Sequence, residues 1–408
     1  MEGSEIAARR ICVVTSSRAD YGLLCGLMQA IRDDEALDLQ VIATGMHLSP
    51  EFGLTYRSIE QDGFRIDRKV EMLLSADSDS AVTKSIGVGL IAFSDALDDL
   101  RPDIVVVLGD RFELLSAAIA ALIARIPIAH IHGGETSQGA IDEGVRHAVT
   151  KMASLHFPAS EAYRWRIIQM GEDPAFVFAY GAPGLDALNS VTLLTWHELQ
   201  LELDFRLGSP TAIVTYHPVT LERDSAGRQI DDLLAALLQE KVRALFTKSN
   251  ADMQGRLINE RIAAFCREHP TDYRLYDNLG QAVYLSCLRH LDLMVGNSSS
   301  GLIEAPSFGM PAVNIGDRQR GRIKATNVID VGYSAAEIAS GIRQALSPTW
   351  RAGLKAVENP YVGRGNGSVS FRIKQRLKEA ELGESLLKKH FHDLAPGTDS
   401  QSSLRGAS

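Results

Sequence analysis

The stretch LDLMVGNSSSGLIE, residues 291–304, is the part of the sequence from which the fold prediction starts. Its first five residues form an apolar run typical of a buried strand, and residues 302–308 look helical. The small residues between them place free backbone amides and serine hydroxyls at a helix start, which favours binding of an anion such as phosphate. Glu304 follows one turn later, where its carboxylate would accept hydrogen bonds from sugar hydroxyls. A serine N-cap followed by a packing glycine is the alternative interpretation.

The same alternation of short apolar runs and longer amphipathic segments extends over most of the chain. Apolar strands separated by helices predict parallel sheets that are covered on both faces. The predicted strands of a first sheet are 11–15, 39–43, 104–108 and 126–131, and those of a second are 212–215, 244–247, 291–295 and 312–315. The sequence therefore predicts an α/β protein with two Rossmann-like, doubly wound domains.

A polar, helical connection around residues 185–209 separates the two groups of strands. We predict an N-terminal domain over residues 1–188 and a second domain over residues 189–366. Residues 367–394 carry a helical pattern that is expected to pack back on the first domain. The Ser-, Gly- and Thr-rich residues 395–408 predict a disordered tail.

Composition limits the kind of ligand and the compartment. The chain has 408 residues and a formal net charge of -9, which disfavours nucleic-acid and anionic-membrane surfaces. Its four cysteines show no metal-type spacing, which suggests a reducing cytoplasm. The longest apolar stretch, residues 117–131, is broken by Arg125 and Pro127, so neither a signal peptide nor a membrane span is expected. A small anionic ligand held by a few placed cations fits best.

Polar residues follow the predicted strands at seven consecutive strand ends. Ligands of open parallel sheets bind beyond the carboxyl ends of the strands. The segments at these ends are 16–22, 45–47, 109–113 and 130–135 in the first domain and 216–218, 248–250 and 297–301 in the second. Core packing alone does not require titratable and amide side chains at all of these places. They predict a ligand cleft between the two domains.

Several other enzyme classes lack their motifs here. The chain has no GxxxxGK[ST] loop, no dinucleotide fingerprint in a strand–helix context and no GxSxG elbow around Ser299. His130 and His132 with Asp110 could hold zinc, since imidazole and carboxylate are its ligands. No third close histidine or cysteine accompanies the pair, so we expect neither a metal nor another cofactor.

Seven motifs in order resemble one enzyme family. They are SSRADYG from Ser16, GDRFE from Gly109, HIHGGE from His130, GAIDEGVRHAVTKM from Gly139, YHPVT from Tyr216, GNSSSGLIE from Gly296 and NIGDRQRGR from Asn314. Together they resemble the hydrolysing UDP-N-acetylglucosamine 2-epimerases of bacterial sialic-acid and legionaminic-acid synthesis. The resemblance covers roughly residues 10 to 375, and it implies a glycosyltransferase-B-like pair of domains with UDP held mainly by the second.

The reaction implied by this resemblance converts UDP-N-acetylglucosamine and water to N-acetylmannosamine and UDP. UDP would leave by anti elimination to give a 2-acetamidoglucal, and water would then add to the double bond. Loss of the C2 proton and of the diphosphate requires acid/base groups and cations. The matching catalytic positions are Asp110, His132, Asp142 and Glu143. His132 replaces a glutamate of some relatives, which leaves open the group that removes the C2 proton.

The resemblance also implies the substrate-binding positions. Arg18, Ser298, Ser299 and Ser300 would hold the diphosphate, Glu304 the ribose, and His217, Asn250 and Arg318 the nucleotide side of the cleft. Arginine suits the phosphate because its planar fork donates two hydrogen bonds. Other matched positions, with roles less defined, are Asp20, His47, Arg111, Glu135 and Arg146.

Three alternatives stay open at the level of sequence. A sister group acts on UDP-2,4-diacetamido-2,4,6-trideoxyglucose; a glycosyltransferase of the same architecture would also use a UDP site; and a non-catalytic sensor would bind the sugar nucleotide without turnover. The acid/base cluster disfavours simple transfer. The expected partner is a UDP-sugar rather than nucleic acid or membrane, and the expected state is a cytoplasmic homodimer or homotetramer.

Overall fold

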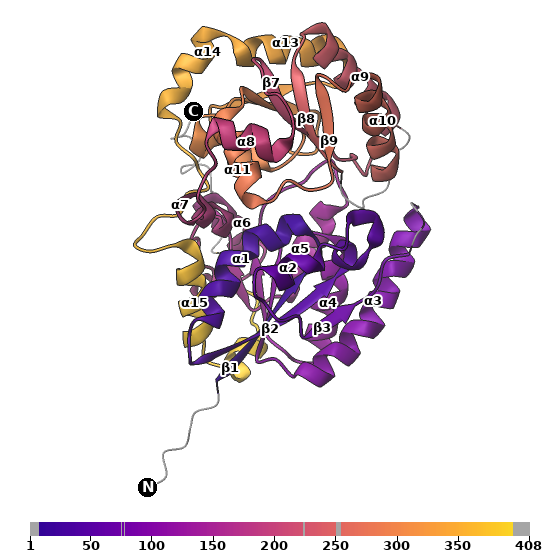
Figure 1. The fold of residues 1–408 in the computed structure, drawn as a ribbon. Helices are drawn as coiled ribbons and strands as arrows, with labels where there is room; N and C mark the ends of the chain where they lie inside the picture. Colours follow the sequence, from indigo (N-terminus) through magenta and orange to yellow (C-terminus); the bar gives the residue numbers. More distant parts are fainter. Residues whose placement is uncertain (1–7, 75, 77, 223–224, 250–253, 395–408) are drawn as a thin grey trace.

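The protein folds around two separate six-stranded sheets (Figure 1). The computed structural model describes residues 8–74, 76, 78–222, 225–249 and 254–394. We call the first sheet with its helices the N-terminal half and the second sheet with its helices the C-terminal half. All neighbouring strands run parallel, so the prediction of two doubly wound α/β units is confirmed.

The N-terminal half has the strand order β3-β2-β1-β4-β5-β6. Its strands are β1 (Arg9–Thr15), β2 (Leu37–Thr44), β3 (Arg68–Val70), β4 (Ile104–Leu108), β5 (Ile128–Ile131) and β6 (Leu155–Phe157). Its helices are α1 (Arg18–Arg32), α2 (Tyr56–Gln61), α3 (Asp79–Leu100), α4 (Phe112–Ile123), α5 (Asp142–Met152) and α6 (Glu161–Gln169). The connection to the second sheet contains α7 (Ala187–Ser190) and α8 (Trp196–Leu203).

The C-terminal half has the order β12-β11-β10-β7-β8-β9. Its strands are β7 (Thr211–Thr215), β8 (Arg243–Thr247), β9 (Tyr273–Tyr276), β10 (Leu293–Gly296), β11 (Ala312–Ile315) and β12 (Val328–Val331). Its helices are α9 (Ala226–Gln239), α10 (Gly255–Glu268), α11 (Gln281–His290), α12 (Ser300–Ile303), α13 (Ala335–Leu346) and α14 (Pro348–Gly353), and α15 (Val369–Glu379) and α16 (Glu384–Leu387) follow.

In both sheets the strand order reverses between the first and the fourth strand of that half. The reversal lies between β1 and β4 in the first sheet and between β7 and β10 in the second. In a doubly wound sheet the helices diverge to opposite faces there and leave a crevice at the carboxyl ends of the strands. The ligand crevice of each half is therefore built by the segments that follow these four strands.

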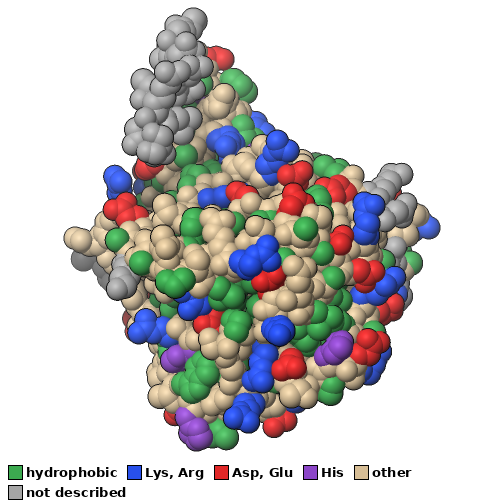
Figure 2. Space-filling model, turned by 90° about the horizontal axis from the view of Figure 1, so that it is seen from above, with side chains coloured by type: hydrophobic (Ala, Val, Ile, Leu, Met, Phe, Trp, Pro, Cys, Tyr) green, Lys and Arg blue, Asp and Glu red, His purple; other side chains and the backbone are tan. Residues whose placement is uncertain are grey.

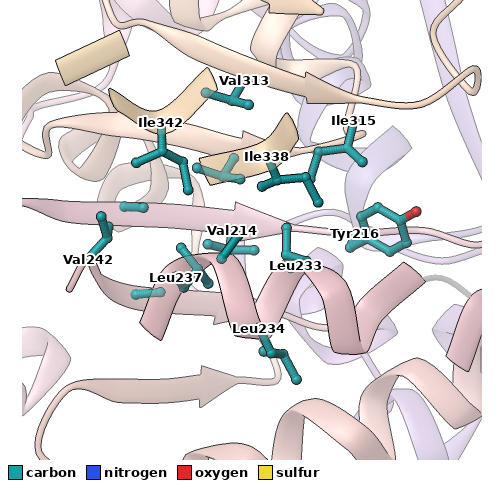
Figure 3. Close-up of a cluster of buried hydrophobic side chains, with 14 of the residues drawn as sticks. Val214, Tyr216, Leu233, Leu234, Leu237, Val242, Val313, Ile315, Ile338 and Ile342 are labelled. Atoms are coloured by element: carbon teal, nitrogen blue, oxygen red, sulfur yellow. The ribbon is translucent and has the colours of Figure 1, made fainter. Parts of the chain in front are cut away.

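Each sheet is buried on both faces. In the C-terminal half, Val214 and Val313 pack under helices α9 and α13 through residues such as Leu233, Leu237 and Ile338 (Figure 3). The alternate residues of the same strands pack on the opposite face with α8 and α11. In the N-terminal half, α1 and α15 cover one face, and α3 and α4 cover the other. Burial of each aliphatic side chain stabilises the fold by about 1.5–3 kcal/mol.

The chain passes between the halves twice, through residues 181–210 and residues 354–368. The two passages lie side by side, because the Ala182 amide donates to the Tyr361 carbonyl (3.0 Å) and the Asp186 carboxylate accepts from the amides of Val369 (2.8 Å) and Ser370 (2.7 Å). Helix α15 then lies against α1 (Figure 1). The boundaries at 188 and 366 stay predictions, and the predicted disordered tail, 395–408, lies outside the described residues.

Helix α3 is long and apolar enough to cross a membrane when only length and composition are considered, and it is the one such helix among the described residues. Its inner face nevertheless contributes Phe93, Ala96 and Leu97 to the core beneath α4. It therefore serves as a covering helix of the first sheet. On the face shown in Figure 2, Lys and Arg side chains are interspersed with Asp and Glu side chains, as on an ordinary solvated surface.

Candidate active site

The loop after β1 is held by the carboxylate of Asp20. It accepts hydrogen bonds from the Ser16 amide (3.0 Å), the Ser17 amide (3.1 Å) and the Thr15 hydroxyl (2.5 Å). His47 is fully buried behind the loop, with Nε2 3.0 Å from Thr15 Oγ1 and Nδ1 bonded to a second threonine. These bonds indicate that Asp20 and His47 shape the loop rather than reach a ligand directly.

Arg18 stands in the first turn of α1 and faces the C-terminal half. Its Nη2 lies beside Gly280, 3.7 Å from the position that a Cβ atom would take there. Burial lowers the pKa of Arg18 to about 10, although Asp62 and Tyr21 favour the charged form. Within the part of the chain that the structure describes, its guanidinium has no hydrogen-bond partner. This half-buried cation is thus available to an anion in the cleft.

Asp110, at the end of β4, is bound to the fully buried guanidinium of Arg146. Arg146 also donates to the backbone carbonyl of His132 (2.8 Å), and the Ser137 hydroxyl donates to Asp110 (3.1 Å). Burial opposes ionisation of Asp110, but the nearby arginines, Arg146 first, outweigh it and lower its pKa. Arg146 therefore holds Asp110 as a carboxylate beside the backbone of His132.

His132 and Glu135 form a buried pair. The Nδ1 atom of His132 lies 2.5 Å from Oε1 of Glu135, and its Nε2 atom has no hydrogen-bond partner among the described residues. The backbone of His132 has a φ of 62°, a left-handed conformation that costs a non-glycine residue about 1–3 kcal/mol. Burial disfavours the Glu135 carboxylate, yet the charges of His132 and Arg322 lower its pKa to about 2. The pair leaves one imidazole nitrogen available for proton transfer.

Arg322 belongs to this cluster, although the sequence analysis assigned a role only to Arg318 of the same motif. Its side chain is 8% exposed, its Nε donates to the Thr136 carbonyl (2.8 Å), and its Nη2 lies 3.4 Å from Oε2 of Glu135. The residue follows β11 in the C-terminal half and yet contacts the N-terminal half. The arginine-rich motif GDRQRGR was the one signal in the sequence that pointed to this residue. The spacing of residues within a motif cannot show that a side chain contacts another domain.

Asp142 and Glu143 lie at the start of α5, where Glu143 supports the neighbouring loop. Oε2 of Glu143 accepts from the Ser137 amide (2.5 Å), and its Oε1 lies 3.2 Å from Nε2 of His147. Asp142 is the first residue of the helix and is partly exposed. The structure thus gives Glu143 a structural contact beside the cluster and leaves Asp142 at its edge.

Asn297 joins the two switch-point strands of the C-terminal half. Its side chain accepts from the His217 amide and donates to the His217 carbonyl, both at 2.7 Å. Burial, followed by the charges of Arg318 and Arg111, lowers the pKa of His217 well below its usual value. Gly296 adopts a φ of 136°, and a Cβ atom there would stand 2.0 Å from the Thr215 carbonyl oxygen. The Asn297 contacts thus fix the backbone of His217 after β7, and burial together with the two arginine charges disfavours its imidazolium form.

The serine loop follows directly. Ser298 Oγ accepts from the Ser300 amide (3.3 Å), and the Tyr284 hydroxyl donates to Ser300 Oγ (2.7 Å). The helix that begins here is short, since α12 ends at Ile303 and is followed by a 3₁₀ turn, Ala305–Phe308. The sequence predicted a single helical segment over residues 302–308 instead. Burial raises the pKa of Glu304, whose Oε2 has no hydrogen-bond partner within the described ranges.

The remaining residues that were singled out from the sequence have the following contacts. Arg111 pairs with the buried Glu113 (2.9 Å), and Arg318 donates to the Asn297 carbonyl (3.2 Å). Asn250 lies outside the described residues. Both nitrogens of His130 are engaged, Nε2 at 2.7 Å from the Gly109 carbonyl and Nδ1 at 3.1 Å from Thr150 Oγ1. In the described part of the chain, no group of three His, Cys, Asp or Glu side chains is placed to hold a metal ion.

Comparison with known proteins identifies the family to which the chain belongs. The sequence model of a family described as UDP-N-acetylglucosamine 2-epimerase matches residues 29–378. The chain belongs to this family. The 2-epimerase is 44% identical to the GDP/UDP-N,N'-diacetylbacillosamine 2-epimerase (hydrolyzing) of Campylobacter jejuni, over 80% of this chain and 85% of the relative. It is 38% identical to the UDP-N,N'-diacetylbacillosamine 2-epimerase (hydrolyzing) of Legionella pneumophila, over 93% and 98%.

The architecture has solved counterparts. The UDP-GlcNAc 2-epimerase of Neisseria meningitidis, bound to UDP-GlcNAc, aligns with a TM-score of 0.75 at 18% identity, over 91% of this chain and 100% of that structure. This likeness confirms the expected glycosyltransferase-B-like fold of the 2-epimerase. The resemblance to the hydrolysing enzymes is also confirmed, and the protein is an enzyme of this type.

Proposed function

We propose that this enzyme inverts C2 of a UDP-2-acetamido sugar while it releases UDP, and that UDP-N,N'-diacetylbacillosamine is the preferred substrate. That compound is the 2,4-diacetamido-2,4,6-trideoxyglucose derivative named above as an alternative. The observation that carries the reaction type is the buried His132–Glu135 pair beside Asp110 and Arg146. The 44% and 38% identical relatives, both named for diacetylbacillosamine, support the choice of sugar.

The nucleotide would bind at the C-terminal half. The serine loop after β10 offers hydroxyl and amide donors, and Arg18 of α1 brings a half-buried guanidinium beside Gly280 of the same half. Arg318 adds positive charge beside the neutral His217. In this pose the diphosphate lies over Ser298, Ser299 and Ser300, while the carboxylate of Glu304 accepts from the ribose hydroxyls. The sugar then points toward the cluster in the N-terminal half.

Elimination needs a base at C2 and stabilisation of the leaving diphosphate. We assign the acid/base work to His132, whose Nε2 is open, and to Asp110, which Arg146 keeps ionised. The C2 proton moves to the base, its electron pair forms the C1–C2 double bond, and the C1–O bond breaks with its electrons on UDP. Arg18 and the serine loop balance the charge that develops on the diphosphate.

Hydration completes the inversion. A base takes one proton from a water molecule as its oxygen bonds to C1 of the glycal, and a protonated group delivers hydrogen to C2 on the face opposite to the one from which the original proton left. The enclosed cluster limits access of bulk water, so that addition follows elimination in order. Asp142, at the edge of the cluster, is the candidate that would assist this second step.

UDP-N-acetylglucosamine is the second candidate substrate. The family description names it, and the seven motifs resemble enzymes that use it. The two sugars differ in the groups at C4 and C6, and the acid/base cluster is arranged around C1 and C2. The same chemistry therefore serves either sugar.

The decisive experiment is a competition of substrates. The purified enzyme would be incubated with UDP-N,N'-diacetylbacillosamine, its GDP analogue and UDP-N-acetylglucosamine, and the free sugars would be identified by NMR. We expect the highest kcat/KM for UDP-N,N'-diacetylbacillosamine. A higher value for UDP-N-acetylglucosamine would reverse the choice of sugar, and recovery of all three intact would contradict the reaction. Unchanged rates in excess EDTA are expected for a site without metal.

A further inference from the structure

Arg322 connects the C-terminal half to the acid/base pair of the N-terminal half. The loop that carries it is docked at both ends, because the Thr136 hydroxyl donates to the Arg320 carbonyl (3.3 Å) and the Ile323 amide donates to the Tyr163 hydroxyl (2.9 Å). Between these anchors the Arg322 side chain reaches Glu135 and the Thr136 carbonyl. The guanidinium therefore has a fixed position beside the carboxylate.

The charge of Arg322 matters because Glu135 is 1% exposed. A carboxylate in such a place takes up a proton unless nearby cations offset the loss of water. Arg322 lies 3.4 Å from Oε2, whereas Nη1 of Arg146 lies 3.9 Å away and the Nη2 atom of Arg146 is bound to Asp110. Of these two arginines, Arg322 is thus the closer cation to Oε2. A protonated Glu135 would offer the Nδ1–H of His132 only a neutral carboxyl oxygen, which is a weaker acceptor than a carboxylate.

We propose that Arg322 is a positioning residue that keeps Glu135 ionised and, through Glu135, directs Nε2 of His132 toward the substrate. Because Arg322 comes from the C-terminal half, the acid/base pair is complete only when the two halves are together. The proposal rests on the proposed function in that His132 is taken as an acid/base group. It adds the requirement that a residue of the C-terminal half contacts the acid/base pair of the N-terminal half, which the proposed chemistry does not by itself contain.

A purely structural tie is the competing explanation, since Arg322 also bonds a backbone carbonyl. The positioning role predicts a change in proton affinity, because loss of a cation raises the proton affinity of the His132–Glu135 pair as a unit. A structural tie predicts no such change. The other charged or titratable groups that face this pair are Asp110 after β4, Arg146 on α5, Tyr163 on α6, Glu304 after α12, and Tyr361 before α15. None of these side chains is itself changed by a substitution of Arg322.

The test compares Arg322→Gln and Arg322→Lys with the control Arg320→Gln in the full chain. Arg320 lies in the same loop, and its side chain is 68% exposed. For Arg322→Gln we expect kcat to fall about 100-fold, with KM nearly unchanged, because an acid/base group contributes about 10²–10⁴-fold. The acidic limb of the kcat profile should move to higher pH by about one unit. Arg322→Lys should keep the limb in place with partial activity, and Arg320→Gln should match the wild type.

A second readout does not depend on turnover. The side-chain carboxyl carbon signal of Glu135, identified by its loss in Glu135→Gln, would be titrated by carbon NMR in the free enzyme. We expect the titration midpoint in Arg322→Gln to lie at higher pH than in the wild type, and that in Arg322→Lys to stay close to it. Unchanged midpoints and limbs in Arg322→Gln would overturn the proposal even if kcat falls. A wild type that releases no epimerised sugar would contradict the proposed function instead, and the NMR comparison would still decide the role of Arg322.

Discussion

The left-handed backbone of His132 is the residue-scale feature that most directly connects conformation with chemistry. With a φ of 62°, the residue turns its ring toward Glu135 while its amide continues the sheet by bonding to the Phe157 carbonyl (3.1 Å). Arg146 caps the other side by donating to the His132 carbonyl. Strained conformations persist where surrounding contacts determine them, and they concentrate at functional sites.

Asp110→Asn should nearly abolish exchange at C2. Elimination and hydration replace the original C2 hydrogen with one from solvent, so wild-type enzyme in deuterium oxide should give a free sugar with one deuterium at C2. The variant loses the charge that Arg146 holds in place, and we expect a loss of about 10²–10⁴-fold in turnover. Mass spectrometry and proton NMR of the product measure both effects. A wild-type product that retains its C2 hydrogen would point to oxidation and re-reduction instead, and full activity of the variant would remove Asp110 from the mechanism.

Glu304→Gln should weaken nucleotide binding more than it slows the bound-state reaction. Ribose is held both before and during the reaction, so the lost contact is common to both states. A hydrogen bond to a charged group contributes about 1.5–3 kcal/mol, which corresponds to roughly 10- to 100-fold in affinity for UDP. Titration calorimetry with UDP and steady-state kinetics separate the two effects. Unchanged UDP affinity combined with a low kcat would move Glu304 from the ribose to the chemistry.

At the scale of elements, the eight strands predicted from the sequence are the central strands, and the four that were missed are edges. The missed strands are β3, β6, β9 and β12, which form the outer positions of the two sheets. They are three or four residues long and include polar or charged residues such as Lys69, His156, Arg274 and Asp330. Edge strands need only one hydrogen-bonded neighbour and are exposed on one side, so they lack the continuous apolar run of a central strand.

The site was predictable to a similar extent. The loops after β1, β4, β7 and β10 were predicted because polar residues follow apolar strands there, and the topology brings them together. The internal contacts of Asp20 and His47, and the approach of Arg322 to Glu135, were not predictable. They depend on how loops fold and how the halves meet, which local sequence patterns do not encode.

A buried carboxylate joins α5, β6 and the C-terminal segment. Glu172 accepts from Lys151 (2.5 Å) and pairs with His156 (3.0 Å) and Lys389 (2.6 Å). Burial opposes its ionisation, but these partners lower its pKa to about 2. Because the folded pKa lies below the unfolded one, the pair network stabilises the fold above the ordinary pKa of glutamate, and this contribution is lost as the pH falls toward 2.

Glu172→Gln should therefore lower the free energy of unfolding by about 1–3 kcal/mol near pH 7, since it removes the buried charged acceptor that Lys151, His156 and Lys389 share. The difference from the wild type should shrink as the pH is lowered from 5 toward 2. Denaturant unfolding at a series of pH values measures it. Glu161→Gln is the matched control, because Glu161 is 66% exposed and lies 4.0 Å from Arg164. A constant difference between Glu172→Gln and the wild type across the whole pH range would contradict the assignment.

At the scale of the whole molecule, the two halves meet across the cleft by contacts of different strength. The Leu221 amide donates to the Gly139 carbonyl (3.3 Å), and Arg322, with its side chain 8% exposed, reaches Glu135. At the rim Arg256 forms a bidentate pair with Glu51 (2.8 and 2.7 Å), with both side chains more than 40% exposed. Exposed pairs contribute about 0–1 kcal/mol, so the rim contact alone does not hold the cleft closed.

We expect the cleft to close further when substrate binds, because a glycal must be protected while water enters in order. The radius of gyration from small-angle scattering should decrease when UDP is added at saturation. Glu51→Gln should leave this decrease nearly unchanged, since it removes only the exposed rim pair. Identical scattering profiles with and without UDP would contradict a large closing motion.

The paired passages of the chain between the halves restrict how such a motion proceeds. Two polypeptide segments are bonded side by side, through Ala182 to Tyr361 and through Asp186 to the start of α15, and we expect such a pair to bend together more easily than it twists. We therefore expect the two halves to approach each other along a single path. A single path would return the guanidinium of Arg322 to the same place relative to Glu135 at each closure, and the geometry of proton transfer would then be reproduced from one catalytic cycle to the next.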